Sequence, residues 1–273
     1  MELVYVYDKI QVKVSSNIYQ AADQFFTSFG MLEMKYVFPD HLTFLSENNE
    51  PHPLCLMAAE SLQNYLQNQQ DWIHNFGLNG SGDGTVIGKM FGVLAVKTLE
   101  DEIGYLAAFS GKLAGGNHHS RFVPPVFDAL TENSFLNNGM QELTRINLEI
   151  RTLQNLKISE NKPEIDSLKL KRKKHSISLQ NEIFEKYHFL NQSGEEKSLN
   201  EIFKSANYKN PPSGAGECAA PKLLQYAFLH NMKPLAIAEF WWGLSPKSDL
   251  WKHGNFYPCC REKCEPILAH MLS

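Results

Sequence analysis

Residues 217–242 read ECAAPKLLQYAFLHNMKPLAIAEFWW, and this stretch decides the expected fold. Its first half has the pattern of a helix that starts near Glu217 and ends before Pro234. Its second half, residues 235–242, is an apolar and aromatic run of strand length. A loop rich in glycine and proline, residues 210–216, leads into the helix. This order of loop, helix and apolar strand indicates a compact unit that contains both kinds of element.

Segments upstream extend the same unit. Residues 53–70 carry apolar side chains at helical spacing, which predicts an amphipathic helix. Residues 89–97 and 103–111 are apolar runs joined by the acidic turn TLEDE, which predicts a β-hairpin. We therefore expect an α+β fold.

The composition changes between residues 127 and 203, where charge rises and glycine, proline and aromatic residues become scarce. Two apolar stripes at helical spacing, interrupted at Pro163, predict two long helices folded back as a coiled-coil hairpin. We expect residues 1–125 and 211–273 to pack as one α+β core. Residues 126–210 would then form an inserted, projecting helical hairpin.

The second predicted helix carries a run of basic residues. Its members are Lys169, Lys171, Arg172, Lys173 and Lys174. Such a run is typical of a solvated helix face, and it can also contact nucleic-acid phosphates. A homodimer formed through the hairpin is a third interpretation of this segment.

Bulk properties limit the classes of partner. The formal net charge is -4 and the sequence pI is about 6.2, so any contact with RNA must come from a local basic patch. The first residues lack the pattern of a signal peptide, and no apolar run is long enough to span a bilayer. We expect a cytoplasmic protein with no membrane partner and with reduced cysteines.

The cysteines near the C-terminus predict a metal site. Cys218 follows the glycine-rich loop at a helix start, where the helix dipole favours a thiolate. In the segment 257–264, YPCCREKC, a helix opening at Pro258 would put Cys260 and Cys264 one turn apart, with Cys259 as an alternative partner for Cys264. Three thiolates from two helix starts predict a zinc site with an open fourth position, and Glu217 would act as general acid/base. The alternative is that these cysteines are small apolar side chains.

This arrangement resembles the fold of zinc-dependent nucleobase deaminases. Those enzymes carry a His/Cys-x-Glu helix start, a strand, and a Pro-Cys-x-x-Cys helix start. Residues 218–222, Cys-Ala-Ala-Pro-Lys, look like the Cys-Ala-Glu-Pro-Lys form of some bacterial toxin deaminases. Ala220 stands here at the position of the catalytic glutamate, and the paired cysteines are spaced more widely. The resemblance therefore favours a degenerate relative that retains zinc over a competent deaminase.

Larger blocks resemble the N-terminal extension of certain bacterial RluA-type pseudouridine synthases. They include KMFGVLAVK, FVPPVFD, GAGECAAPKLL and FYPCC…CEPIL, and the match covers roughly residues 85–273. In that family a catalytic domain with an Arg-Leu-Asp motif follows the extension, and this sequence has no such motif and ends at Ser273. The chain would then be a free-standing extension or a fragment.

The resemblance to these synthases implies an accessory module of RNA modification, which is not itself a uridine isomerase. RNA and a pseudouridine synthase catalytic domain would be its partners. A zinc-dependent hydrolase of the deaminase type is the competing function.

Overall fold

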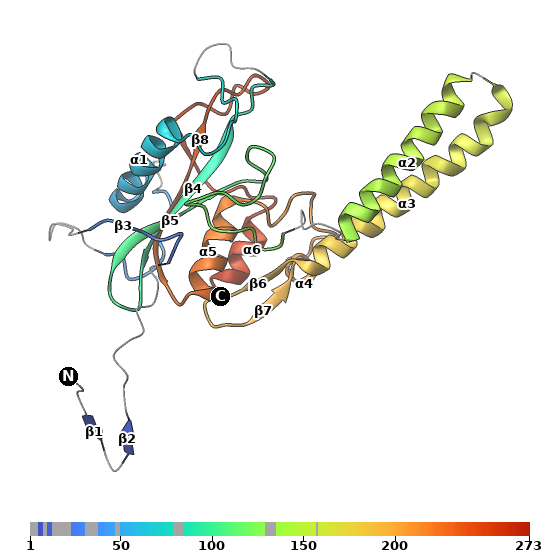
Figure 1. Cartoon of the computed structure of the whole chain (residues 1–273). Helices are drawn as coiled ribbons and strands as arrows, with labels where there is room; N and C mark the ends of the chain where they lie inside the picture. The colour runs from blue at the N-terminus through green and yellow to red at the C-terminus, as the bar shows by residue number, and fades with distance from the viewer. Residues whose placement is uncertain are drawn as a thin grey trace.

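The structure, a computed structural model, describes residues 5–7, 10–12, 23–30, 38–46, 50–78, 84–128, 135–156 and 158–273. It is a mixed α/β protein, in which helices cover both faces of an antiparallel sheet and a pair of long helices projects to one side (Figure 1). No helix in these ranges has the length and apolar character needed to cross a membrane.

The central sheet has five strands, and every neighbouring pair is antiparallel. In spatial order these strands are β3 (Thr27–Ser28), β5 (Ile103–Phe109), β4 (Lys89–Lys97), β8 (Lys233–Trp242) and β9 (Phe256–Tyr257). The predicted hairpin at 89–97 and 103–111 and the predicted strand at 235–242 are confirmed as β4, β5 and β8. Two shorter ladders pair β1 (Tyr5–Tyr7) with β2 (Ile10–Val12) and β6 (His188–Leu190) with β7 (Glu196–Ser198).

Each face of the sheet has its own apolar core, because successive strand residues point to opposite faces. Phe91, Val93 and Ala95 of β4 pack toward α1 (Pro53–Asn68), the helix predicted at 53–70. Leu94 and Val96 point the other way, toward α5 (Ala219–Leu229) and α6 (Glu265–Met271). The sheet therefore lies between a layer with α1 and a layer with α5 and α6.

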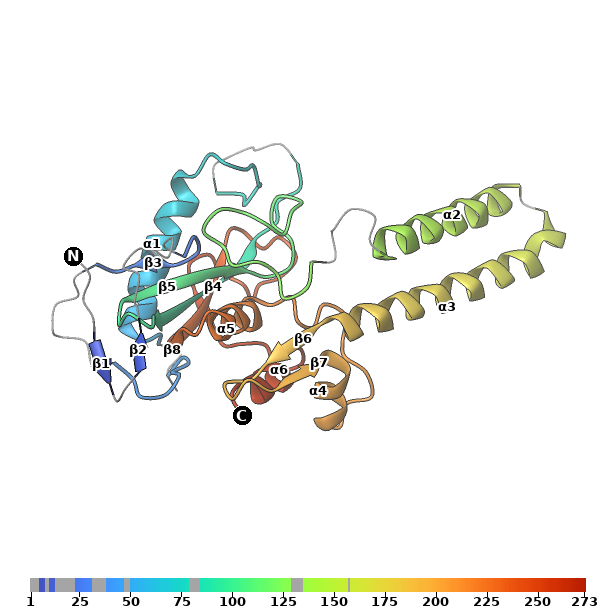
Figure 2. The same ribbon diagram turned by 60° about the horizontal axis from the view of Figure 1, so that its bottom comes forward.

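The projecting pair consists of α2 (Phe135–Asn155) and α3 (Lys162–Lys186), with the 3-10 turn η1 (Ser159–Asn161) between them (Figure 2). Ile146 and Ile150 of α2 are buried. Gly139 permits close contact between the helices, since a Cβ there would lie 2.3 Å from Leu179 Cδ2. Two long helices are present as predicted from the apolar stripes, and their coiled-coil character stays a prediction.

The end of α3 belongs to the main body. Phe184 and Tyr187 join the core around α5, together with α4 (Leu199–Ser205). Ser198 and Glu201 close the start of α4 with a capping box. The range 126–210 therefore contains β6, β7 and α4 in addition to the long helices, and this added part packs near α6.

Gly92 of β4 determines how closely α5 approaches the sheet. It pairs with Glu239 of β8, and a Cβ at Gly92 would lie 2.8 Å from the Cβ of Ala219 and 3.1 Å from Leu223 Cδ1. The backbone of α5 would have to move to make room, because Ala219 has no flexible side chain. The missing side chain at Gly92 thus positions the start of α5.

We expect Gly92→Ala to lower the free energy of unfolding by about 1–3 kcal/mol, as overpacking of a dense core does. Urea unfolding followed by circular dichroism measures this loss. Gly116→Ala is the matched control, because a Cβ there has its nearest neighbour at 3.4 Å, an ordinary contact. Equal stability of the two variants would contradict the proposed role of Gly92.

Candidate metal centre

Cys218 stands at the N-cap of α5, and its thiol does not cap the helix. The loop before it turns through Gly214 and Gly216, which have φ values of 75° and 88°. A Cβ at Gly216 would also lie 2.9 Å from the ring of Tyr187, so glycine is needed there for both reasons. The loop therefore places the Cys218 thiol at the start of α5, where the thiol is not used to cap the helix.

Cys260 and Cys264 precede α6, which begins at Glu265. The prediction of a helix opening at Pro258 is wrong in its starting point. Pro266 explains the difference, because proline has no N–H and is tolerated only in the first turn of a helix. The two cysteines are instead joined by a turn, in which the N–H of Cys264 donates to the carbonyl of Cys260 at 3.1 Å.

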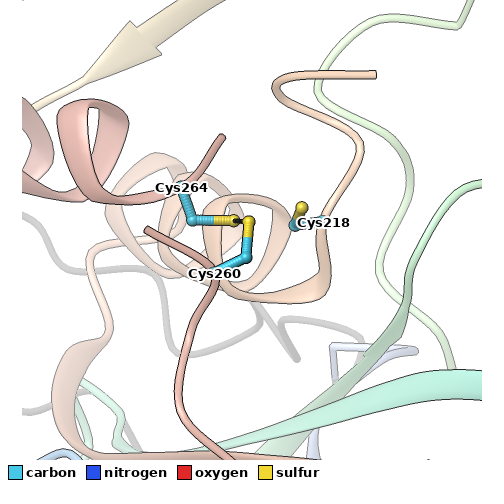
Figure 3. A group of neighbouring side chains, drawn as sticks. All are labelled: Cys218, Cys260 and Cys264. Atoms are coloured by element: carbon cyan, nitrogen blue, oxygen red, sulfur yellow. Dashed lines mark hydrogen bonds between the residues drawn. The ribbon is translucent and has the colours of Figure 1, made fainter. Parts of the chain in front are cut away.

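The three sulfur atoms of Cys218, Cys260 and Cys264 lie within 4.8 Å of one another. Figure 3 shows the sulfurs of Cys260 and Cys264 side by side, in contact at 3.4 Å, with Cys218 next to them. Cys264 is fully buried, Cys218 is half-buried and Cys260 is exposed. This cluster can hold a metal ion, and its exposed side faces solvent at Cys260.

The three thiols do not ionise independently. Hydrogen bonds from Cys218 and Cys264 hold the pKa of the Cys260 thiol far below its usual range. Hydrogen bonds with Cys218 and Cys260 raise the pKa of Cys264, and the hydrogen bond with Cys260 raises that of Cys218 to about 12. A bound cation would favour the thiolate form of all three.

Glu239 of β8 connects the two segments that carry these thiols. Its side chain is 5% exposed, and its Oε1 accepts the N–H of Ala220 at 3.2 Å. The thiol of Cys259 donates to the same carboxyl group, and burial raises the pKa of Glu239 to about 7. Glu239 thus accepts a backbone N–H at the start of α5, a role that the N-cap residue Cys218 does not fill. Its hydrogen bond with Cys259 keeps that thiol outside the cluster.

Sequence reasoning selected Cys218, Cys260 and Cys264 and left Cys259 open, and it missed Glu239. The available signal was a single acidic residue inside the apolar run LAIAEFWW. A buried carboxylate requires hydrogen-bond donors, so an acidic residue in a buried strand predicts donor groups on the helix layer that packs against it.

Glu217 lies next to Cys218 in sequence and is not a member of the thiol cluster. Its carbonyl accepts the N–H of Gly111 at 2.8 Å, and its carboxylate lies on the same side as Lys89 and Lys222. Glu217 also lines a cavity with Lys222 at the root of the helical pair.

Lys222 is a second polar residue that the sequence analysis did not select. It is only 4% exposed, and its Nζ donates to the carbonyls of Phe109 and Gly111 at 2.9 and 3.3 Å. The same amine lies 5.0 Å from the centre of the Phe109 ring. Burial lowers the pKa of Lys222 to about 8, and the charge of Glu217 opposes this shift.

The predicted nucleic-acid contacts all lie on α3. Lys171 pairs with Glu142 of α2 at 3.0 Å, Arg172 donates to Asn147 at 2.8 Å, and Lys169 lies 3.9 Å from Asp166. Lys173 and Lys174 are exposed, and neither makes an ion pair with a residue in the described ranges. The run therefore serves partly to join the two long helices, and it leaves two lysines directed to solvent.

No protein-family model, curated protein or solved structure matches this chain.

The low pKa of Lys222 predicts a specific dependence of stability on pH. Between about pH 8 and the ordinary pKa of 10.5, the unfolded chain binds a proton on this amine that the folded chain has released. The contribution of Lys222 to stability therefore rises as the pH increases through this range, and it is lost as the pH falls through about 8.

Urea unfolding of the wild type and of Lys222→Met at a series of pH values isolates this contribution. We expect the unfolding free energy of the wild type, relative to the variant, to rise between pH 8 and 10.5. If the difference in unfolding free energy between the two proteins stays constant across this range, the pKa of Lys222 is not lowered in the folded chain.

Proposed function

We propose that this chain is a zinc-holding accessory module of RNA modification, and that it is not itself a uridine isomerase. The thiol cluster carries this proposal, because it joins the start of α5 to the segment before α6. Thiolates suit zinc among the common divalent ions, and structural zinc sites stabilise the fold that brings their ligands together.

The exposed end of the basic run supports the RNA part of the proposal. Lys173 and Lys174 lie on a helix that projects from the body, where a long nucleic acid can reach them (Figure 1). The sequence also lacks the Arg-Leu-Asp motif that carries the catalytic aspartate in the pseudouridine synthases that it resembles.

Metal content of protein purified without chelator tests the zinc site. We expect about one zinc per chain in the wild type, and strong loss of zinc in Cys218→Ser and in Cys264→Ser. Cys55→Ser is the matched control, since Cys55 is a buried thiol of α1 outside the cluster. Zinc retained in both cluster variants would show that these thiols are not the ligands.

RNA binding tests the second part, with Lys173→Glu/Lys174→Glu as the variant. We expect weaker binding and a flatter dependence of affinity on salt, because each lost phosphate contact removes roughly 0.7 from the slope for a single strand. Lys171 is left unchanged, since its pair with Glu142 joins the two long helices. The matched control is Lys204→Glu/Lys209→Glu, which reverses two exposed charges elsewhere. Binding that responds equally to both double variants would refute a contact on α3.

A zinc-dependent hydrolase of the nucleobase deaminase type is the second candidate. It is favoured by the three-thiol set, which contains no fourth protein ligand in the described ranges. Zinc in such a site would activate water. Glu217, the general acid/base expected from the sequence, would have to turn its carboxylate from the cavity with Lys222 toward the ion. Ala220 at the glutamate position weighs against this candidate. Release of ammonia from a nucleobase by the zinc-loaded protein would favour it over the accessory module.

A further inference from the structure

A cavity of about 320 Å³ lies where the root of the long helices meets the start of α5. Its walls are mostly apolar, with Phe127 and Tyr187 among the larger side chains and Leu136, Met140 and Ile183 from α2 and α3. Its polar lining includes the side chains of Lys112, Asn117, Asn137, Glu217 and Lys222. The volume lies at the lower end of the range for small-molecule sites, so a single small molecule fits it.

Lys222 gives this cavity a buried cationic group. An ammonium has three N–H donors, and two carbonyl oxygens accept from this one. No carboxylate in the described part of the chain forms an ion pair with Lys222, although the side chain is 4% exposed. A buried charge without a paired counter-ion is costly, so an anionic group that enters the cavity gains from meeting this amine.

Glu217 supplies the opposite charge on the same cavity. Its carboxylate is exposed, and it forms neither a hydrogen bond nor an ion pair with a described residue. Lys222 and Glu217 therefore line one cavity without forming an ion pair, and Lys112, the third charged residue of the lining, is exposed. A ligand that carries both an anion and a cation can pair with each of them, whereas a ligand with one charge satisfies only one.

We propose that this cavity binds a free α-amino acid with a large apolar side chain. The carboxylate of the ligand pairs with Lys222, and its ammonium pairs with Glu217. Its side chain packs against Phe127, Tyr187 and the residues of α2 and α3. Because the cavity is shared between the helical pair and α5, the ligand links the orientation of the hairpin to the main body. The site uses none of the three thiols, so it does not rest on the zinc-holding accessory function proposed above.

Isothermal titration calorimetry of the full chain tests the site with L-phenylalanine, 3-phenylpropanoate and 2-phenylethylamine. These three compounds share an aromatic body and differ in their charged groups. We expect L-phenylalanine to bind, and each compound with a single charge to bind about ten-fold more weakly or less. No heat with L-phenylalanine at millimolar concentration, or equal affinity for 3-phenylpropanoate, overturns the proposal.

Two variants assign the charged contacts. Glu217→Gln should weaken L-phenylalanine by about ten-fold and leave 3-phenylpropanoate unchanged, since only the ammonium contact is lost. Lys222→Met should abolish binding of both, and Lys204→Met is the control at an exposed site. Glu217 is exposed, so Glu217→Gln should fold normally, and it tests the ammonium contact even where Lys222→Met fails to fold. Unchanged affinity for L-phenylalanine in Glu217→Gln refutes the assignment.

Discussion

The carboxyl group of Glu239 is the contact on which the rest of the site depends. It lies buried beneath α5, accepts the N–H of Ala220 and receives the thiol of Cys259. The strand partner of Glu239 is Gly92, whose missing side chain lets the start of α5 reach this carboxyl group. A polar group from the sheet thus fixes both the helix that carries Cys218 and the segment that carries Cys260 and Cys264. Replacing it by an apolar residue would leave buried donors without acceptors.

Two adjacent residues at the start of α5 belong to two different candidate sites. The thiol of Cys218 lies in the cluster with Cys260 and Cys264, whereas the adjacent Glu217 lines the cavity with Lys222. The loop before them, with positive φ angles at Gly214 and Gly216, sets the path of the chain into these two residues. The protein therefore has a candidate metal site and a candidate small-molecule site that share α5 and use different side chains.

Much of the fold follows from patterns within single segments. The apolar runs of β4, β5 and β8 and the helical spacing of α1 identify these elements, because burial imposes its period directly on the sequence. The thiol cluster was also predictable from three cysteines beside glycine and proline turns. Pro266 carried the information needed to place the start of α6, and it is a better marker of that start than Pro258, from which the helix was predicted. The roles of Glu239 and Lys222 depend on contacts between distant segments, with Ala220, Phe109 and Gly111 as partners, which no local pattern encodes.

X-ray absorption spectroscopy at the zinc edge tests the arrangement of thiols around Glu239 most directly, because it counts the sulfur atoms bound to the ion. We expect three sulfur ligands at about 2.3 Å and one lighter atom in the zinc-loaded protein. Four sulfur ligands would mean that Cys259 leaves Glu239 to bind the metal, which contradicts the role of that carboxyl group. Fewer than three would contradict the cluster of Cys218, Cys260 and Cys264 itself.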